Sequence, residues 1–255
     1  MDLPVTPSLQ LDGKRAIVTG GSKGLGLASA VALAGVGAEV TLVARTAREV
    51  EEAADAINAA GGKAVPAVLD ITDVEATGEW VAAQKAFNIL VNNAGTNRPG
   101  LFVDTRIQDY DDVFSINVRA AYFIAQAVAK RMIADGAKGS IINMSSQMGH
   151  TGAARRTVYC ATKHAMEGFT RAMAAELGQY GIRVNTICPT FIETPMTKPF
   201  FEDKTFRDWV MAKIKLGRLG RLEDVMGAVV FLASDQSALM TGSSLMLDAG
   251  WTGTS

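Results

Sequence analysis

Short, continuously apolar segments alternate with longer alanine-rich segments of helical period, and this alternation constrains the fold most strongly. Most of the short segments lack polar–apolar alternation, which is typical of parallel strands buried on both faces. We predict strands at Arg15–Thr19, Glu39–Ala44, Lys63–Val68, Ile89–Asn92, Ser140–Met144, Ile182–Ile187 and Ser244–Leu247. We predict helices at Leu25–Ala34, Ala47–Ala60, Val74–Phe87, Val113–Ala134, Val158–Tyr180 and Leu222–Ala233. The order predicts an α/β fold: a doubly wound, seven-stranded parallel sheet with helices on both faces, a three-layer sandwich.

Charge and composition exclude several classes of function. The chain has 25 Lys+Arg against 26 Asp+Glu in 255 residues, which does not favour a nucleic-acid partner. No apolar run approaches the roughly 20 residues of a membrane helix, so no membrane partner is expected. Two cysteines and two histidines, without paired spacing, predict no metal site. Met1–Asp12 carries no signal-peptide pattern, and we expect a cytoplasmic protein.

A glycine-rich turn, Thr19–Gly26, joins the first predicted strand to the first predicted helix. Its spacing is Gly-x-x-x-Gly-x-Gly, which permits a tight turn and close approach of a phosphate to the helix N-terminus. The alternative is an ordinary strand-to-helix loop. Its position favours a Rossmann-type dinucleotide site, contacted by Gly20, Ser22, Lys23, Gly24, Leu25 and Gly26.

Arg45 stands at the end of the second predicted strand, where an NAD site usually has Asp or Glu. With Lys23 in the turn, two cations and no carboxylate favour the 2′-phosphate of NADP(H). The alternative is that Arg45 is a solvated surface charge, which leaves NAD(H) possible.

Tyr159 and Lys163 are four residues apart on a predicted helix and therefore share one face. A nearby cation favours the phenolate, so we expect Lys163 to lower the pKa of Tyr159 and let it exchange a proton with an alcohol or ketone. Ser146 ends the fifth predicted strand, thirteen residues before the tyrosine. Asn92–Gly95 ends the fourth strand at the same edge of the sheet, and Asn117 lies on the following helix.

Taken together, these motifs resemble those of the short-chain dehydrogenase/reductase family in its compact form. The matching set is Thr19–Gly26, Asp70, Asn92–Gly95, Asn117, Ser146, Tyr159 with Lys163, and Pro189–Thr194. It extends over almost the whole chain, which predicts a single domain over residues 1–255. One departure is Thr190, where the family commonly has glycine after the proline; a side chain there affects the nicotinamide pocket or the segment that follows.

The resemblance implies a role for each matching residue. Tyr159 is the proton donor or acceptor, and Lys163 lowers its pKa and holds the nicotinamide ribose. Ser146 bonds the substrate oxygen, and Asn117 holds a water on the proton path. Asn92 and Asn117 have an alternative role, bonding to backbone. The implied cofactor contacts are the six turn residues above with Arg45, Asp70, Ile71, Asn92, Ala94, Gly95, Tyr159, Lys163, Pro189, Ile192 and Thr194.

Two segments are expected to border the substrate. The first runs from Gln147 to Arg156, where Met148 and Arg156 are candidate contacts beside Ser146 and Tyr159. An arginine there suits a carboxylate or phosphate, although a solvated arginine or one bridging subunits is the alternative. The second, Thr190–Gly217, is rich in aromatic residues and is expected to be a lid; the alternative is a helical hairpin packed on the body.

The resemblance implies hydride transfer between a nicotinamide cofactor and a secondary alcohol or ketone. A sugar acid or polyol, as in gluconate dehydrogenases, is the leading substrate, and a 3-oxoacyl thioester or another ketone is the alternative. A dinucleotide-binding sensor without catalysis would be expected to have lost Tyr159, Lys163 or Ser146, and all three are present. The family also implies a homotetramer, with Val113–Ala134 and Val158–Tyr180 pairing at one interface and the tail through Trp251 forming another.

Overall fold

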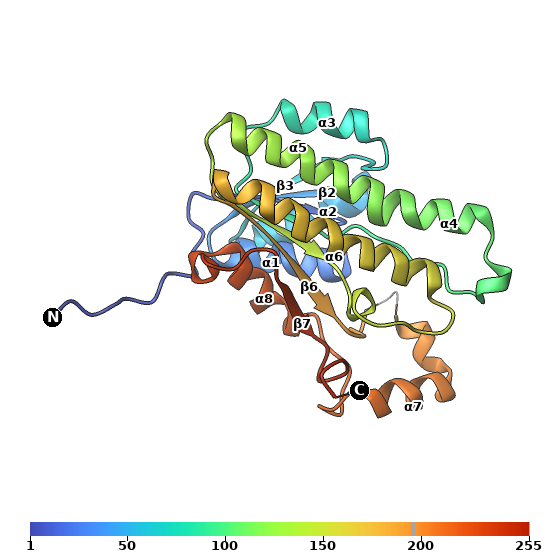
Figure 1. Cartoon of the computed structure of the whole chain (residues 1–255). Helices are drawn as coiled ribbons and strands as arrows, with labels where there is room; N and C mark the ends of the chain where they lie inside the picture. The colour runs from blue at the N-terminus through green and yellow to red at the C-terminus, as the bar shows by residue number, and fades with distance from the viewer. Residues whose placement is uncertain (195–196, 255) are drawn as a thin grey trace.

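A single parallel sheet organises the molecule in the computed structural model, which describes residues 1–194 and 197–254. Its seven strands have the order β3-β2-β1-β4-β5-β6-β7 (Figure 1). Their bounds are β1 Arg15–Thr19, β2 Glu39–Ala44, β3 Lys63–Val68, β4 Ile89–Asn92, β5 Gly139–Met144, β6 Ile182–Pro189 and β7 Ser244–Leu247. The predicted strands and the α/β fold are confirmed, with β5 and β6 slightly longer than predicted.

Helices cover both faces of this sheet. Their bounds are α1 Gly24–Gly35, α2 Ala47–Ala59, α3 Val74–Ala82, α4 Ile107–Phe114, α5 Ala121–Ala134, α6 Thr157–Leu177, α7 Lys204–Lys213 and α8 Glu223–Ala233. Helices α3, α4, α5 and α6 lie on one side of the sheet, and α1, α2 and α8 lie on the other (Figure 1). The result is the three-layer sandwich that the alternation predicts.

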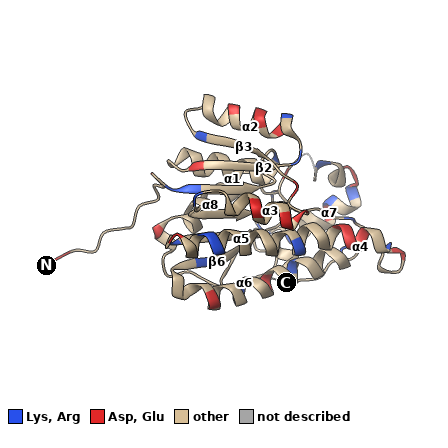
Figure 2. Cartoon of the chain, turned by 90° about the horizontal axis from the view of Figure 1, so that it is seen from above, with Lys and Arg blue, Asp and Glu red and all other residues tan. Residues whose placement is uncertain are grey.

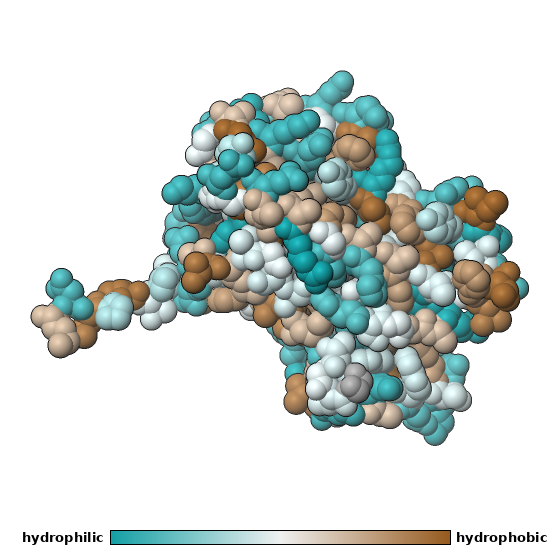
Figure 3. All heavy atoms as spheres, in the orientation of Figure 1, coloured by the Kyte–Doolittle hydropathy of each residue, from teal (hydrophilic) through white to brown (hydrophobic). Residues whose placement is uncertain are grey.

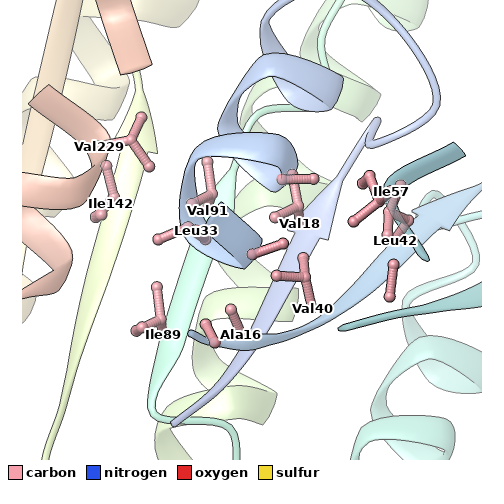
Figure 4. Close-up of a cluster of buried hydrophobic side chains, with 14 of the residues drawn as sticks. Ala16, Val18, Leu33, Val40, Leu42, Ile57, Ile89, Val91, Ile142 and Val229 are labelled. Atoms are coloured by element: carbon pink, nitrogen blue, oxygen red, sulfur yellow. The ribbon is translucent and has the colours of Figure 1, made fainter. Parts of the chain in front are cut away.

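The core consists of two apolar layers, one on each face of the sheet. In the first, which includes Val18 of β1, helices α1 and α8 pack on the sheet, with Val229 beside Ile142 of β5 (Figure 4). In the second, Ile17 packs with Ile124 of α5. Neighbouring residues of β1 thus face opposite layers and are fully buried. This burial on both faces explains why the strand segments are continuously apolar.

Three helices differ from the prediction by more than one residue, and the other predicted helices agree to within one residue at each end. Helix α3 ends at Ala82 rather than at Phe87, because the following residues bond elsewhere: Asp135 accepts from the Ala86 amide at 3.1 Å. The helix predicted from Val113 begins instead at Ile107 as α4 and reaches α5 through a π-helical turn at Ser115–Ala120. A final 3-10 turn at Gly178–Tyr180 follows α6.

The segment from Thr190 to Gly217 contains a short helix at Lys198–Glu202 followed by α7, and residues 195 and 196 lie outside the described part. Its aromatic rings gather around Trp251, which is only 5% exposed. The Trp251 ring centroid lies 5.9 Å from that of Phe191 and 5.3 Å from that of Trp209. The tail residue that was predicted at a subunit interface is therefore buried within its own chain.

The surface mixes acidic and basic residues over the helices of the face seen in Figure 2. Exposed apolar side chains gather where α4 begins, at Leu101, Phe102, Val103 and Ile107, the brown end of the body in Figure 3. The first ten residues are exposed and lead away from the body (Figure 1). Among the described helices, none has both the length and the apolar character that a membrane span requires.

Candidate active site

The glycine turn lies after β1, at the point where the strand order reverses between β1 and β4. In a doubly wound sheet this point forms a ligand crevice. Gly20 and Gly24 have φ of 62° and 56°, which side chains rarely tolerate. A Cβ on Gly26 would overlap the Gly20 carbonyl oxygen. The chain thus keeps a space beside the N-terminus of α1 that only glycine leaves open.

Thr19 and Asn93 hold this turn against the end of β4. The Thr19 hydroxyl accepts hydrogen bonds from the Asn93 and Ala94 amides at 2.9 and 3.0 Å. The Asn93 side-chain amide donates to the Thr19 carbonyl at 3.0 Å. Asn93 was predicted only as part of a motif, and the structure gives it this positioning role. Beyond the turn, Leu25 of α1 packs against the core.

The two predicted 2′-phosphate residues differ in their surroundings. Lys23 pairs with Glu49 of α2, with its Nζ 3.1 Å from the carboxylate, and Ser22 donates to the same group at 3.4 Å. Sequence reasoning missed this carboxylate because it looked only at the end of β2. Arg45 is exposed, and no described side chain forms an ion pair with it. Unlike Lys23, Arg45 is therefore available to bind a 2′-phosphate.

Asp70 and Ile71 follow β3 at the same edge of the sheet. Asp70 accepts from the Thr72 amide and hydroxyl at 3.0 and 2.7 Å. Burial opposes its ionisation, but these bonds and the charge of Arg45 hold the Asp70 pKa below its usual value. Ile71 is buried at 6% exposure. The carboxylate is thus fixed beside Arg45, which places both residues at one end of the crevice.

The two predicted asparagines are largely occupied by the protein itself. The Asn92 amide donates to the Ala121 carbonyl at 2.7 Å, while its buried oxygen has no hydrogen-bond partner among the described residues. Asn117 accepts from the Thr96 amide at 2.8 Å and donates to the Thr96 carbonyl at 2.9 Å. The backbone-bonding alternative therefore describes both side chains well.

Asn117 lies in the π-helical turn between α4 and α5. Such turns interrupt regular helix bonding and often occur at functional sites. Gly95 lies against it, since a Cβ on Gly95 would be 3.1 Å from the Asn117 oxygen. The Asn117 side-chain nitrogen also donates to the Thr162 hydroxyl at 3.2 Å, so both of its protons are used within the protein.

Tyr159, Lys163 and Ser146 come together where α6 begins. Lys163 is 5% exposed, and its ammonium donates to the Met144 carbonyl at 2.7 Å and lies 5.6 Å from the Tyr159 ring centroid. Ser146 is buried, and its hydroxyl accepts from the Met148 amide at 3.1 Å. The structure thus gathers the predicted set.

The pKa of Tyr159 is raised, whereas the sequence predicted that Lys163 would lower it. Burial raises the pKa of Tyr159 to about 12, although the nearby Ser146 hydroxyl and Arg156 charge act in the other direction. Burial also lowers the pKa of Lys163 to about 8. Desolvation is the largest influence on the Tyr159 pKa, and the Lys163 ammonium donates to the Met144 carbonyl. The phenol is therefore protonated at neutral pH.

The end of β6 contributes the remaining predicted cofactor residues. Pro189 ends the strand, and the Thr190 amide donates to the Leu247 carbonyl at 3.0 Å. The Thr190 hydroxyl is buried without a hydrogen-bond partner in the described structure. Ile192 forms a parallel bridge with Gly220, and the Thr194 hydroxyl lies 3.1 Å from that of Thr197.

A cleft of about 600 Å³ lies between the two predicted substrate segments. Met148 and Arg156 line one side, and Phe191, Phe200 and Trp209 line the other. The Arg156 guanidinium lies 5.4 Å from the Phe200 ring centroid. Burial lowers the Arg156 pKa, so this charge is poorly solvated. The predicted lid segment therefore forms one wall of a cleft whose other wall contains Arg156, three residues before Tyr159.

The features of the crevice fit a dinucleotide cofactor. The glycine turn leaves room beside a helix N-terminus, where backbone amides favour a phosphate. The buried oxygens of Asn92 and Thr190 lack partners, and a bound polar group would supply them. The Asn92 and Thr190 oxygens lie at the carboxyl ends of β4 and β6, on the other side of β1 from Arg45 at the end of β2.

Comparisons with known proteins agree with this fit. Residues 20–252 match a family model described as enoyl-(acyl carrier protein) reductase. The chain is 39% identical over 246 residues to gluconate 5-dehydrogenase of Gluconobacter oxydans, covering 95% of this chain and 96% of the relative. It is 37% identical over 246 residues to L-xylulose reductase of Mus musculus, covering 96% and 99%.

A solved structure gives the same result. The gluconate 5-dehydrogenase of Burkholderia cenocepacia, in complex with NADP and tartrate, superposes with a TM-score of 0.92 at 33% identity, covering 97% of this chain and 98% of that one. Fold, motifs and relatives therefore agree over nearly the full length. The chain belongs to the short-chain dehydrogenase/reductase family and is an oxidoreductase of that family.

Proposed function

We propose that this enzyme uses NADP(H) in preference to NAD(H) and interconverts a secondary alcohol and a ketone in a sugar acid or polyol. The observation that carries the proposal is the meeting of Tyr159, Ser146 and Lys163 between the glycine turn and the aromatic cleft. The glycine turn would bind the cofactor, and the aromatic cleft would bind the substrate. Tyr159, which would transfer the proton, would lie between the two.

The cofactor would bind across the carboxyl ends of the strands. The turn at Gly20, Gly24 and Gly26 would bind its phosphates, and Asp70 and Ile71 would border the adenine. The rest of the cofactor would be lined by Asn92, Ala94, Gly95, Pro189, Ile192 and Thr194. When bound, the nicotinamide supplies or accepts the hydride. Preference for NADP(H) is supported by the unpaired Arg45 and by the NADP in the Burkholderia relative. The Lys23–Glu49 pair is the feature that weakens this preference.

Tyr159 would act as the proton donor in ketone reduction. Its raised pKa keeps the phenol protonated at neutral pH, which suits donation to an oxygen that is becoming an alkoxide. The Ser146 hydroxyl would bond that oxygen where negative charge develops. Lys163 would hold the ribose and supply positive charge behind the phenol, and a main-chain group at Asn117 would hold the water that continues the proton path.

The cleft supports a substrate with a carboxylate. Its walls are largely apolar and aromatic, and Arg156 is a partly desolvated cation that an anion would stabilise. The names of the Gluconobacter and Burkholderia relatives include gluconate, and tartrate accompanies the latter. The L-xylulose reductase relative supports a polyol as the other member of the proposed substrate class. A 3-oxoacyl thioester is the alternative, since a family model described as enoyl-(acyl carrier protein) reductase also matches.

A substrate panel tests the proposal. We expect sugar acids to turn over best, with NADP(H) favoured in steady-state rates, while thioester-only activity or a clear NAD(H) preference would refute it. Tyr159→Phe should lower kcat by at least about 100-fold and leave cofactor affinity near normal. Arg156→Ala should raise KM for acids alone, with Arg171→Ala, an exposed arginine on α6 outside the cleft, as the matched control. An unchanged KM for every acid would exclude the Arg156 role.

We also propose a homotetramer in the cytoplasm. The family implies the assembly, and exposed apolar side chains at Phe102, Ile107, Tyr122 and Phe123 would be covered in it. Both cysteines are free thiols, which suits a reducing compartment. Sedimentation velocity measures the assembly directly, and a monomer at micromolar concentration would refute it.

A further inference from the structure

Three side chains of types that commonly bind metals, those of His150, Glu167 and Cys188, meet near the catalytic residues. The Cys188 sulfur lies 3.3 Å from Glu167 Oε1 and 3.5 Å from His150 Nε2. His150 Nε2 lies 3.4 Å from the same carboxylate oxygen. The three ligand atoms therefore form a nearly equilateral triangle. Nothing in the proposed oxidoreductase chemistry uses them.

The triangle is built by one strand–helix–strand unit. His150 follows β5, Glu167 lies on α6 and Cys188 lies near the end of β6. Glu167 and Cys188 are buried at 3% and 0% exposure, whereas the His150 side chain is 23% exposed. A ligand can therefore approach from solvent past the imidazole and reach two buried donors.

Two hydroxyl groups fix the orientation of the carboxylate. Ser244 and Thr186 donate to Glu167 Oε2 at 2.6 and 3.2 Å. Oε2 is thereby satisfied, and Oε1 is turned toward the sulfur and the imidazole. This is the pattern in which outer hydrogen bonds hold a ligating group in place.

We propose that His150, Glu167 and Cys188 bind one zinc-class divalent transition-metal ion. In a tetrahedral site, metal–ligand bonds of about 2.0–2.3 Å put neighbouring ligand atoms about 3.3–3.8 Å apart. The three observed separations, 3.3, 3.4 and 3.5 Å, fall in this range. Three protein ligands leave the fourth position for water, and the side chains need only small movements to bind.

The donor set selects the class of metal. A thiolate and an imidazole favour zinc, cobalt or copper over magnesium or calcium, which prefer sites made only of oxygen. The Cys188 thiol proton passes to solvent as the metal–sulfur bond forms, so charge and protons balance. The Ser145 hydroxyl is also buried nearby without a hydrogen bond of good geometry, and it could accept one from the metal-bound water.

The site is contiguous with the catalytic machinery. A Cβ on Gly149 would meet the Ser145 hydroxyl, the Glu167 side chain and the Lys163 carbonyl at 3.0–3.1 Å. His150 also stands at the start of the segment that leads to Arg156 and the cleft. Metal binding would therefore restrain the loop between Ser146 and Tyr159, and we expect it to raise the thermal unfolding temperature.

Cobalt binding to the metal-free, full-length protein tests the proposal. We expect one Co²⁺ per chain, an intense thiolate-to-cobalt absorption band, and displacement by one Zn²⁺. His150→Gln and Cys188→Ala should each weaken binding at least tenfold, and Cys188→Ala should abolish the band. Cys160→Ala and His164→Gln are matched controls, since they remove the other cysteine and histidine, and they should bind as the wild type does.

A second measurement keeps the test decisive if a buried variant fails to fold. X-ray absorption spectroscopy of the zinc-loaded wild-type protein should show one sulfur neighbour at about 2.3 Å with lighter atoms at about 2.0 Å, and Cys160→Ala should give the same spectrum. Absence of stoichiometric binding would overturn the proposal. So would cobalt binding without the thiolate band, or binding that is lost in Cys160→Ala and kept in Cys188→Ala.

Discussion

Replacing Gly26 by alanine tests the glycine turn at its most crowded point. A Cβ there would overlap the Gly20 carbonyl oxygen and lie 2.6 Å from the Asn93 side-chain nitrogen. Ordinary contacts are longer, so the turn or the start of α1 must shift. Overpacking of this kind costs about 1–3 kcal/mol. If the shift opens the phosphate site, this cost corresponds to about 5- to 140-fold weaker cofactor binding.

Gly35 offers a control in the same helix. A Cβ on Gly35 meets nothing within 4 Å, so Gly35→Ala should bind the cofactor normally and be slightly more stable. Fluorescence titration with NADPH gives the dissociation constant, and thermal unfolding of the same samples gives the stability. Gly26→Ala with wild-type affinity and wild-type unfolding temperature would show that the turn has room and that the reasoning is wrong.

Three further outcomes follow from the site. Arg45→Ala should weaken NADPH binding about tenfold or more and leave NADH unchanged, whereas Glu49→Gln should free Lys23 and strengthen NADPH binding; equal effects on both cofactors would contradict this. Burial raises the pKa of Tyr159 to about 12 from its ordinary value of about 10, so the unfolded chain releases this proton first. The free energy of unfolding should then fall between about pH 10 and 12, less steeply in Tyr159→Phe, as denaturant titrations at several pH values would show. Trp251→Ala should lower the free energy of unfolding by about 3–5 kcal/mol, and a surface-like loss below 1 kcal/mol would contradict its burial.

The strands could be predicted because burial on both faces leaves a direct mark on the sequence. Helix α4 was not predicted: Ile107–Phe114 contains three aspartates, and its apolar side chains at helical spacing lie mostly outside the core, with Val113 its only buried residue. The end of α3 was missed for the opposite reason. The residues after Ala82 favour a helix, but the Asp135 carboxylate accepts from the Ala86 amide and holds that segment outside the helix.

The sequence predicted which residues meet at the site, but it did not predict their pKa values or their ion-pair partners. Strand ends and helix faces place Ser146, Tyr159 and Lys163 together without coordinates. The direction of the Tyr159 pKa depends on how deeply the ring is buried and on the Met144 carbonyl, which takes the Lys163 ammonium. Likewise, Glu49 reaches Lys23 from the next helix, across 26 residues of sequence.

The position of the triangle of His150, Glu167 and Cys188 follows from the Tyr159–Lys163 motif and the strand order. Metal sites are usually sought by short spacings, and these ligands are too far apart in sequence for that search. Lys163 must face the sheet to reach the active site, and a residue four positions later shares its face. Glu167 is therefore buried as a consequence of the catalytic lysine's position, and the neighbouring ends of β5 and β6 bring it the imidazole and the thiol. A buried carboxylate needs hydrogen-bond partners, so the residues around Glu167 must be polar. His150 and Cys188 are polar neighbours of types that also bind metals, which is why metal binding can be tested at this position.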